Sequence, residues 1–265
     1  MQFEFQLLQW STRIPTDGLT QPTDWWQWAL ATPQLPGPSV AVVPALPQMP
    51  AMMRRRLDRL GRLACHVAYA CHPSEPAIPM VFASRYGDSA GSLALLDDLI
   101  HEQPVSPMGF GLSVHNAVSA LYSIAQGHTD NTVVVAAGPA TVTAALTEAA
   151  ALLADCAREV LVVYYEAPLP QEYTQFQDEM ACEYAWAWRV ARPNVGHLDY
   201  PSGATIAIKL AALTTQAESA APAWPTGLTV LRQVLRQLSQ THVDQAVLVP
   251  HVAQIDVPHS GGGRA

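Results

Sequence analysis

Histidine is the residue type in this sequence with the widest chemical range, because a neutral imidazole binds metal ions and also transfers protons. Nine histidines are present. A metal site would place at least two of them at a spacing such as HxxxH or HExxH, and no such spacing occurs. We therefore expect no metal site and no cofactor. The histidines are His66, His72, His101, His115, His128, His197, His242, His251 and His259.

Cysteine and serine are the candidate nucleophiles. Cys65, Cys71, Cys156 and Cys182 lie in helical patterns without CxxC spacing, so we expect reduced core thiols rather than a disulfide framework or a zinc site. Ser113 lies in the string GLSVH, which lacks the second glycine of the GxSxG turn of α/β-hydrolases. A serine hydrolase or acyltransferase is therefore only a minor alternative.

An arginine cluster is the strongest charge feature. It holds five of the fourteen basic residues of a chain whose net charge is −8. One interpretation is a docking surface for an acidic partner, because basic patches steer and orient such partners. The other is a solvated helix face or a set of intramolecular ion pairs. The five residues are Arg54, Arg55, Arg56, Arg59 and Arg62.

Composition excludes several classes of protein. Only 14% of the residues are charged, which argues against nucleic-acid binding, since that requires clustered Lys and Arg against phosphate. No apolar stretch approaches the ~20 residues that cross a bilayer, and the first ten residues lack the pattern of a signal peptide. We expect one cytoplasmic domain without membrane contact.

Apolar runs and helical periodicity alternate along the chain. They predict an α/β fold with a mostly parallel mixed sheet and helices on both faces. The predicted strands are 39–43, 78–83, 132–137, 160–165 and 203–210, and the predicted helices are 52–71, 89–102, 113–126, 140–155 and 226–240. Residues 1–245 form the predicted domain, with a Pro- and Trp-rich arm at 1–37 and a loop or helical insert at 167–201. Residues 246–265 form a tail.

The order of these elements, together with several short strings, resembles the amino-terminal half of β-ketoacyl synthases, which have the thiolase-like fold. RRRLDRL at 54–60 resembles the motif RxMDRF, and residues 104–116 resemble the segment that begins with SP and ends with Asn. Residues 81–87 resemble the strand and glycine turn between them. Glu166 lies where ketosynthases have GGxE, and residues 203–210 resemble their GAxxLVL strand.

The nucleophile position is the main departure from the family pattern. Ketosynthases carry their cysteine in a string like TVVTACATG, and this chain has TVVVAAGPA at 132–140. The resemblance places Ala137 at the cysteine position, on a turn where a helix amino terminus lowers a thiol pKa. A methyl group cannot attack a thioester. The resemblance covers residues 38–212 only, without the half that supplies both catalytic histidines, so we expect a chain without enzymatic activity.

The resemblance also implies a role and a partner. Short ketosynthase-like chains resemble the chain-length-factor-like subunits of aryl polyene and related type II polyketide or fatty-acid pathways, which pair with a full-length β-ketoacyl synthase. The helix before the nucleophile strand lines the acyl tunnel there, which makes Val114, Val118, Leu121 and Tyr122 candidates for setting chain length. An apolar stripe at this spacing also fits an ordinary core.

Alternatives remain open at this point. The arginine cluster becomes a candidate docking surface for an acyl carrier protein, or that contact belongs to the catalytic partner alone. The chain could instead be a purely structural, solubilising partner, and the sequence does not prove the expected heterodimer over a homodimer. Half of such a fold leaves a sheet face and helices uncovered, so we expect an obligate partner and poor solubility alone.

Overall fold

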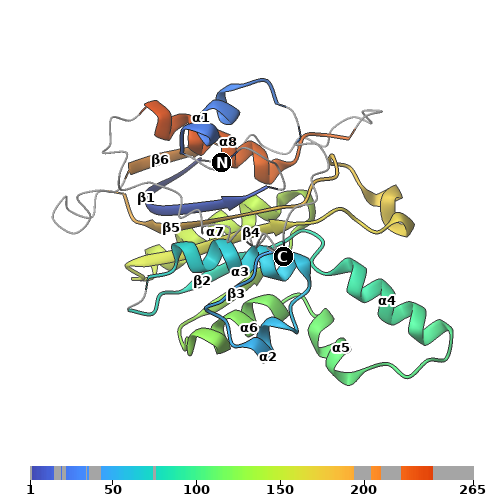
Figure 1. Ribbon diagram of the computed structural model, residues 1–265. Helices are drawn as coiled ribbons and strands as arrows, with labels where there is room; N and C mark the ends of the chain where they lie inside the picture. Colours follow the sequence, from blue (N-terminus) through green and yellow to red (C-terminus); the bar gives the residue numbers. More distant parts are fainter. Residues whose placement is uncertain are drawn as a thin grey trace, which may run out of the picture.

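One six-stranded sheet organises the protein (Figure 1). The computed structural model describes residues 2–14, 19, 22–33, 35, 43–73, 76–193, 204–209 and 222–240. The strand order is β3-β2-β4-β5-β1-β6. The strands are β1 (Gln2–Arg13), β2 (Met80–Ala83), β3 (Thr132–Val135), β4 (Glu159–Glu166), β5 (Tyr184–Ala191) and β6 (Ala204–Lys209).

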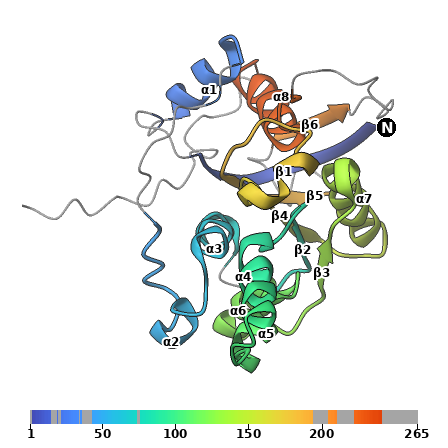
Figure 2. The same cartoon turned by 90° about the vertical axis from the view of Figure 1, so that its right-hand side faces the viewer.

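Helices cover both faces of the sheet (Figure 2). α3 and α6 pack on one face, and α1, α7 and α8 close the other. The helices are α1 (Pro22–Leu30), α2 (Ala51–Arg54), α3 (Arg59–Cys71), α4 (Ser89–Ile100), α5 (Pro107–Ser113), α6 (Ala117–Gln126), α7 (Thr141–Ala154) and α8 (Thr226–Gln240), with 3-10 turns η1 (Gly138–Ala140) and η2 (Gln171–Phe176). The α/β class with two covered faces is therefore confirmed.

β4 shows why both faces must be covered. Its side chains point alternately to the two faces, and Val160 and Val162 join one core cluster while Leu161 and Val163 join the other. All four are fully buried. A strand that is apolar on every residue is typical of a sheet covered on both sides.

Parallel pairing is less extensive than predicted. β2 pairs in parallel with β3 and β4, whereas β4–β5, β5–β1 and β1–β6 are antiparallel. The sheet is mixed, as expected, but its parallel part is confined to three strands. The difference arises because two strands were not predicted.

The two unpredicted strands are β1 and β5. β1 lies inside the predicted arm at 1–37, and β5 lies inside the predicted insert at 167–201, so both of those assignments were wrong. Each strand carries a period-two signal: Phe3, Phe5 and Leu7 alternate with polar residues in β1, and large aromatic residues alternate with alanine in Tyr184–Ala191. This alternation predicts strands, whereas Pro and Trp content does not.

Two predicted helices are each divided. The helix predicted over 52–71 is interrupted by a turn, and Asp58 caps α3 by accepting a hydrogen bond from the Gly61 N–H at 2.6 Å. The helix predicted over 113–126 begins only at Ala117. Ser113 is not its cap, because it ends α5 and donates to the Phe110 carbonyl at 2.9 Å. The predicted strand 39–43 and the tail 246–265 lie largely or wholly outside the described residues.

α8 has the same bounds as the sequence predicts, and it fixes α1 against the sheet. Arg232 on α8 is buried and donates to the carbonyls of Trp28 and Ala31 at the end of α1. Its guanidinium also lies 5.0 Å from the centroid of the Trp28 ring. The two helices therefore close the sheet face beside α7 as one layer.

Gly227 allows α8 to approach the sheet closely. An ideal Cβ at this position lies 2.6 Å from Tyr164 Cε1 and 2.6 Å from the Tyr184 hydroxyl, both of which are buried. We expect Gly227→Ala to lower the free energy of unfolding by about 1–3 kcal/mol through overpacking, as measured by urea denaturation. The control is Gly111→Ala, where the added methyl meets no atom within 4 Å. Equal stability of Gly227→Ala and the wild type would contradict this packing.

Candidate functional site

Ala137 lies on the turn between β3 and α7, as the sequence predicts. β3 ends at Val135, and Gly138 begins the 3-10 turn with a φ of 54°, in the left-handed region that favours glycine. The Ala137 N–H donates to Thr141 Oγ1 at 3.0 Å, which closes the turn onto the first residue of α7. Ala137 is exposed. The turn therefore presents a methyl group at the surface.

The carboxyl ends of the three parallel strands meet beside this turn. The Ser84 N–H, just after β2, donates to the Val135 carbonyl at 3.3 Å. The Ser84 hydroxyl in turn donates to Glu166 Oε2 at 3.4 Å, at the end of β4. In parallel sheets this edge is the usual place for a binding site.

Glu166 is the buried acid of this edge. Its carboxylate also accepts a hydrogen bond from the Arg85 backbone N–H. Burial raises the pKa of Glu166 to about 7, while hydrogen bonds from the Arg85 backbone and the Tyr164 hydroxyl act in the opposite direction. The sequence placed Glu166 only by its likeness to GGxE, without a role.

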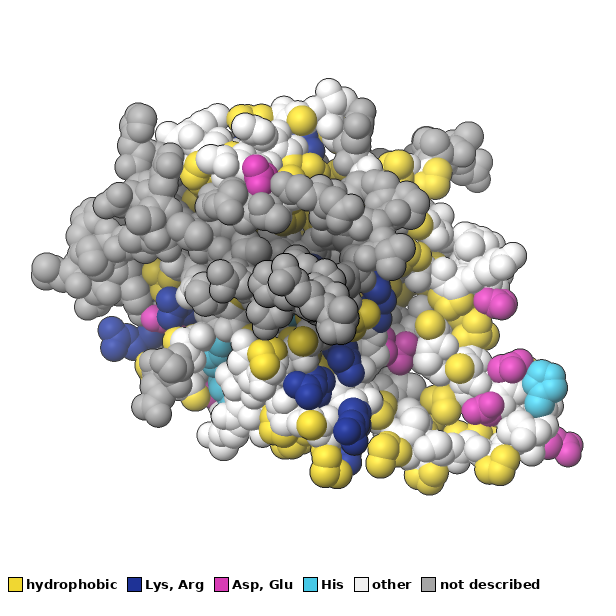
Figure 3. Space-filling view, viewed as in Figure 1, with side chains coloured by type: hydrophobic (Ala, Val, Ile, Leu, Met, Phe, Trp, Pro, Cys, Tyr) yellow, Lys and Arg dark blue, Asp and Glu magenta, His cyan; other side chains and the backbone are white. Residues whose placement is uncertain are grey.

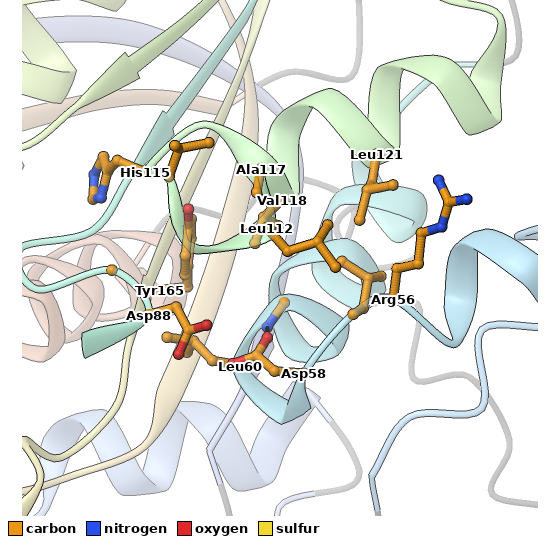
Figure 4. A pocket seen from close by; sticks show the side chains of 14 residues that line it. Arg56, Asp58, Leu60, Asp88, Leu112, His115, Ala117, Val118, Leu121 and Tyr165 are labelled. Atoms are coloured by element: carbon orange, nitrogen blue, oxygen red, sulfur yellow. Dashed lines mark hydrogen bonds between the residues drawn. The ribbon is translucent and has the colours of Figure 1, made fainter. Parts of the chain in front are cut away.

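A pocket lies between α3 and α6, and Gly87 and Asp88, which follow β2, also line it (Figure 4). Its cavity volume is about 40 Å³, enough for a few water molecules. His115 and Arg56 lie toward opposite ends, with apolar side chains between them. The apolar lining consists of Leu57, Leu60, Leu112, Val114, Ala117, Val118 and Leu121, and the polar lining includes Asp58, Asp88 and Tyr165.

Three of the four predicted tunnel residues meet in this pocket. Val114, Val118 and Leu121 line it, and Val114 is 44% exposed. Tyr122 does not line it. Its ring is fully buried in the core, its hydroxyl lies 2.9 Å from His72 Nδ1, and burial raises its pKa.

The five predicted docking arginines divide into two groups. Arg54 and Arg62 donate to backbone carbonyls, and Arg59 forms an ion pair with Glu183 at 2.7 Å. These three belong to the fold, as the intramolecular interpretation of the cluster predicts. Arg55 and Arg56 are exposed. Arg56 alone of the five lines the pocket.

A serine–histidine pair is not formed at Ser113. Its hydroxyl donates to the Phe110 carbonyl, whereas His115 Nε2 lies 3.4 Å from the Val135 carbonyl. Cys65 and Cys71 are buried, and burial raises the pKa of both thiols, which leaves them as unreactive core residues. Neither the serine nor these thiols is prepared for nucleophilic attack.

The described part of the chain offers neither a metal site nor a membrane-spanning helix. No group of three or more His, Cys, Asp or Glu side chains is arranged to hold a metal ion there. Within the same residues, no helix is both long and apolar enough to cross a membrane.

The family follows from a comparison with known domains. A family model described as the N-terminal domain of β-ketoacyl synthase matches residues 25–248. The chain belongs to the β-ketoacyl synthase family. A search of curated proteins finds no match.

Solved ketosynthase structures share the fold. A ketosynthase (ApeO) in complex with its chain length factor (ApeC) from Xenorhabdus doucetiae is similar with a TM-score of 0.71 and 22% identity, over 88% of this chain and 92% of that chain. The ishigamide ketosynthase/chain length factor gives 0.55 and 14%, over 73% and 63%. A β-ketoacyl synthase from Burkholderia phymatum STM815 gives 0.56 and 11%, over 76% and 62%. The match therefore spans less than two thirds of the last two ketosynthase-fold chains.

The raised pKa of Glu166 makes the stability of this ketosynthase-like chain depend on pH. The folded chain binds the Glu166 proton more tightly than the unfolded chain, so the stabilisation is complete below about pH 4.5 and is lost as the pH rises through about 7. We expect a loss on the order of 3 kcal/mol across this window, and we expect Glu166→Gln to remove that component. Urea unfolding at pH 5, 6, 7 and 8 measures both profiles, and parallel profiles would contradict the assignment.

Proposed function

We propose that this chain is a non-catalytic, chain-length-factor-like subunit. It pairs with a full-length β-ketoacyl synthase and helps to shape the acyl tunnel in a type II polyketide or fatty-acid-like pathway, such as aryl polyene assembly. The observation that carries the proposal is the methyl group of Ala137 on the turn where the family resemblance places the nucleophile. This turn keeps the strand–turn–helix geometry, but its side chain has no reactive atom.

An exposed apolar surface supports the need for a protein partner. α4 and α5, with the loop between them, form an arm over residues 89–113 that extends away from the sheet (Figures 1 and 3). Neither helix of the arm has a buried residue. Its exposed large apolar side chains, which we name the arm patch, are Leu96, Leu99, Ile100, Met108 and Phe110. Apolar groups gathered in this way are typical of an interaction site.

The location of this surface differs from the expectation for half of a fold. The sheet faces are covered by the chain's own helices, and the described part of α7 and α8 carries no exposed large apolar side chain. The arm patch is instead near the pocket, because Leu112 of α5 and Val114 after it line the pocket. A partner seated on the arm would therefore also lie beside the pocket.

A ketosynthase is the partner that fits best. The chain belongs to the ketosynthase family, and the similar structure from Xenorhabdus doucetiae is titled as a ketosynthase in complex with its chain length factor. The pocket of about 40 Å³ is too small to hold an acyl chain, so a tunnel requires a second wall. Arg55 and Arg56 remain the candidates for contacting an acyl carrier protein, since the other three arginines bind within the chain.

The arm patch provides the test of the pairing. We expect the chain to co-purify with the ketosynthase encoded nearby, and we expect the double variant Leu99→Asp, Ile100→Asp to weaken that complex at least about tenfold, because two charges would be buried without partners. Both side chains are more than 60% exposed in the chain alone, so its own stability should change by less than about 0.5 kcal/mol. Analytical size exclusion and titration measure the complex.

Leu30→Asp is the matched control, since Leu30 is 60% exposed but lies on α1, away from the arm. It should leave the complex intact. Condensation assays with a malonyl-loaded carrier protein then test whether the chain is non-catalytic. We expect product from the ketosynthase complex and none from this chain alone. Condensation by this chain alone would overturn the proposal, and so would the absence of any ketosynthase complex.

Val118 separates tunnel shaping from a purely structural role. It lies in the pocket on α6, and its Cγ2 is 3.1 Å from where a Cβ on Gly61 of α3 would be. In the complex, Val118→Phe should shift the products toward shorter chains and Val118→Ala toward longer ones, because the side chain changes the volume at the tunnel wall. Mass spectrometry of carrier-bound products measures the lengths. Unchanged lengths at equal complex concentration would leave only the structural role.

A further inference from the structure

The turn from Ser84 to Asp88 joins β2 to the α4–α5 arm and forms part of the pocket. Gly87 and Asp88 both line the pocket. Asp88 begins α4 by accepting a hydrogen bond from the Gly91 N–H at 2.7 Å. Any displacement of this turn therefore moves one wall of the pocket and the base of the arm together.

Glu166 holds the turn through backbone and hydroxyl groups. Its carboxylate accepts from the Arg85 N–H and, at 3.4 Å, from the Ser84 hydroxyl. The same Ser84 oxygen accepts from the Gly87 N–H at 2.8 Å. One buried carboxylate thus holds Ser84 and Arg85 at the beginning of the turn directly, and Gly87 near its end through the Ser84 oxygen.

The turn from Ser84 to Asp88 also determines the position of the His115 side chain. Gly87 has a φ of 57°, and an ideal Cβ on it would lie 2.6 Å from His115 Nδ1, so the imidazole packs directly on the glycine backbone. His115 Nε2 lies 3.4 Å from the Val135 carbonyl, at the end of β3. The end of the pocket is therefore built from three segments that meet at His115.

We infer that Glu166 is a positioning residue of the pocket: through Ser84 and Arg85 it sets where Gly87 and His115 lie, and so sets the end of the space that an acyl chain reaches. This inference rests on the proposed function and deepens it. Glu166 itself does not line this pocket, so its effect must pass through the turn.

The charged groups around Glu166 explain why it acts through hydrogen bonds rather than an ion pair. The Arg85 guanidinium turns away to Asp178 at 2.7 Å, with Glu179 at 3.9 Å. The other titratable groups facing Glu166 are Tyr86, Tyr164, Tyr165, Tyr184 and Glu179. None of these is a cation, which agrees with a pKa raised to about 7 by burial.

Two substitutions at Glu166 distinguish the loss of the hydrogen-bond acceptor from the loss of the negative charge. Glu166→Gln keeps a carbonyl oxygen for the Arg85 N–H, whereas Glu166→Ala removes it. Glu159→Ala is the matched control, because it removes a carboxylate from the opposite end of β4, where Glu159 pairs with Arg189 at 3.4 Å. The control lowers stability without touching the turn.

Hydrogen exchange of the full chain tests the positioning directly. In Glu166→Ala, the amides of Arg85 and Gly87 and the segment around His115 should exchange about tenfold faster, the factor expected for losing one buried hydrogen bond. Glu166→Gln should restore slow exchange, and Glu159→Ala should leave these amides unchanged. Wild-type exchange in Glu166→Ala would overturn the inference.

Product length in the ketosynthase complex is the second readout. Glu166→Ala should change the ratio of the two most abundant lengths at least about twofold at equal complex concentration, with Glu166→Gln and Glu159→Ala near the wild type. Unchanged lengths in Glu166→Ala, when the Val118 variants do change them, would overturn the inference and leave the proposed function intact. If no variant changed the product length, the tunnel-shaping role in the proposed function would be wrong. The exchange result would still stand, because it does not depend on that role.

Discussion

The sheet must be buried on both faces, and the rest of this structure depends on that constraint. β4 is apolar on every central residue, so it is stable only if helices cover both of its sides. α3 and α6 cover one face, while α1, α7 and α8 cover the other. Arg232 ties α1 to α8 through the Trp28 and Ala31 carbonyls. The chain thus completes its own core, and what stays uncovered is the arm rather than the sheet.

This arrangement decides where a function can be located. The carboxyl ends of β2, β3 and β4 lie at one edge, and the buried Glu166 connects them to the turn that leads into the arm. The same turn contributes Gly87 to the pocket between α3 and α6. The turn after β2 therefore connects the sheet edge, the pocket and the arm. A partner bound to the arm, as proposed, would therefore lie next to a segment that also lines the pocket.

Strong local signals made much of the fold predictable from sequence. The apolar run at 132–137 followed by Gly138 and Pro139 predicts a strand and a turn, and the structure has both, with β3 ending at Val135. The period of α8 gives its bounds. β1 and β5 also carry a clear period-two alternation, which is a stronger strand signal than the Pro and Trp content of the segments around them. The sequence does not show which arginines of the cluster bind within the chain. Arg59, for example, pairs with Glu183, which is 124 residues away. Tyr122 is predicted with Leu121 as a tunnel residue, but its ring packs in the core against Tyr69, His72 and Phe82, contacts that the helical pattern does not reveal.

Glu166 is a buried carboxylate beside a turn whose side chain, Ala137, has no reactive group, so its position needs a physical explanation. A buried carboxylate whose pKa is raised to about 7 destabilises the fold at neutral pH, and an apolar side chain there would avoid that cost. A nucleophile would explain such a group, but Ala137 offers none. The remaining explanation is geometric: the Arg85 N–H and the Ser84 hydroxyl need an acceptor at the end of β4 if the turn is to hold Gly87 against His115. The proposed tunnel-shaping role would require this accuracy, because Gly87 and His115 form one end of the pocket.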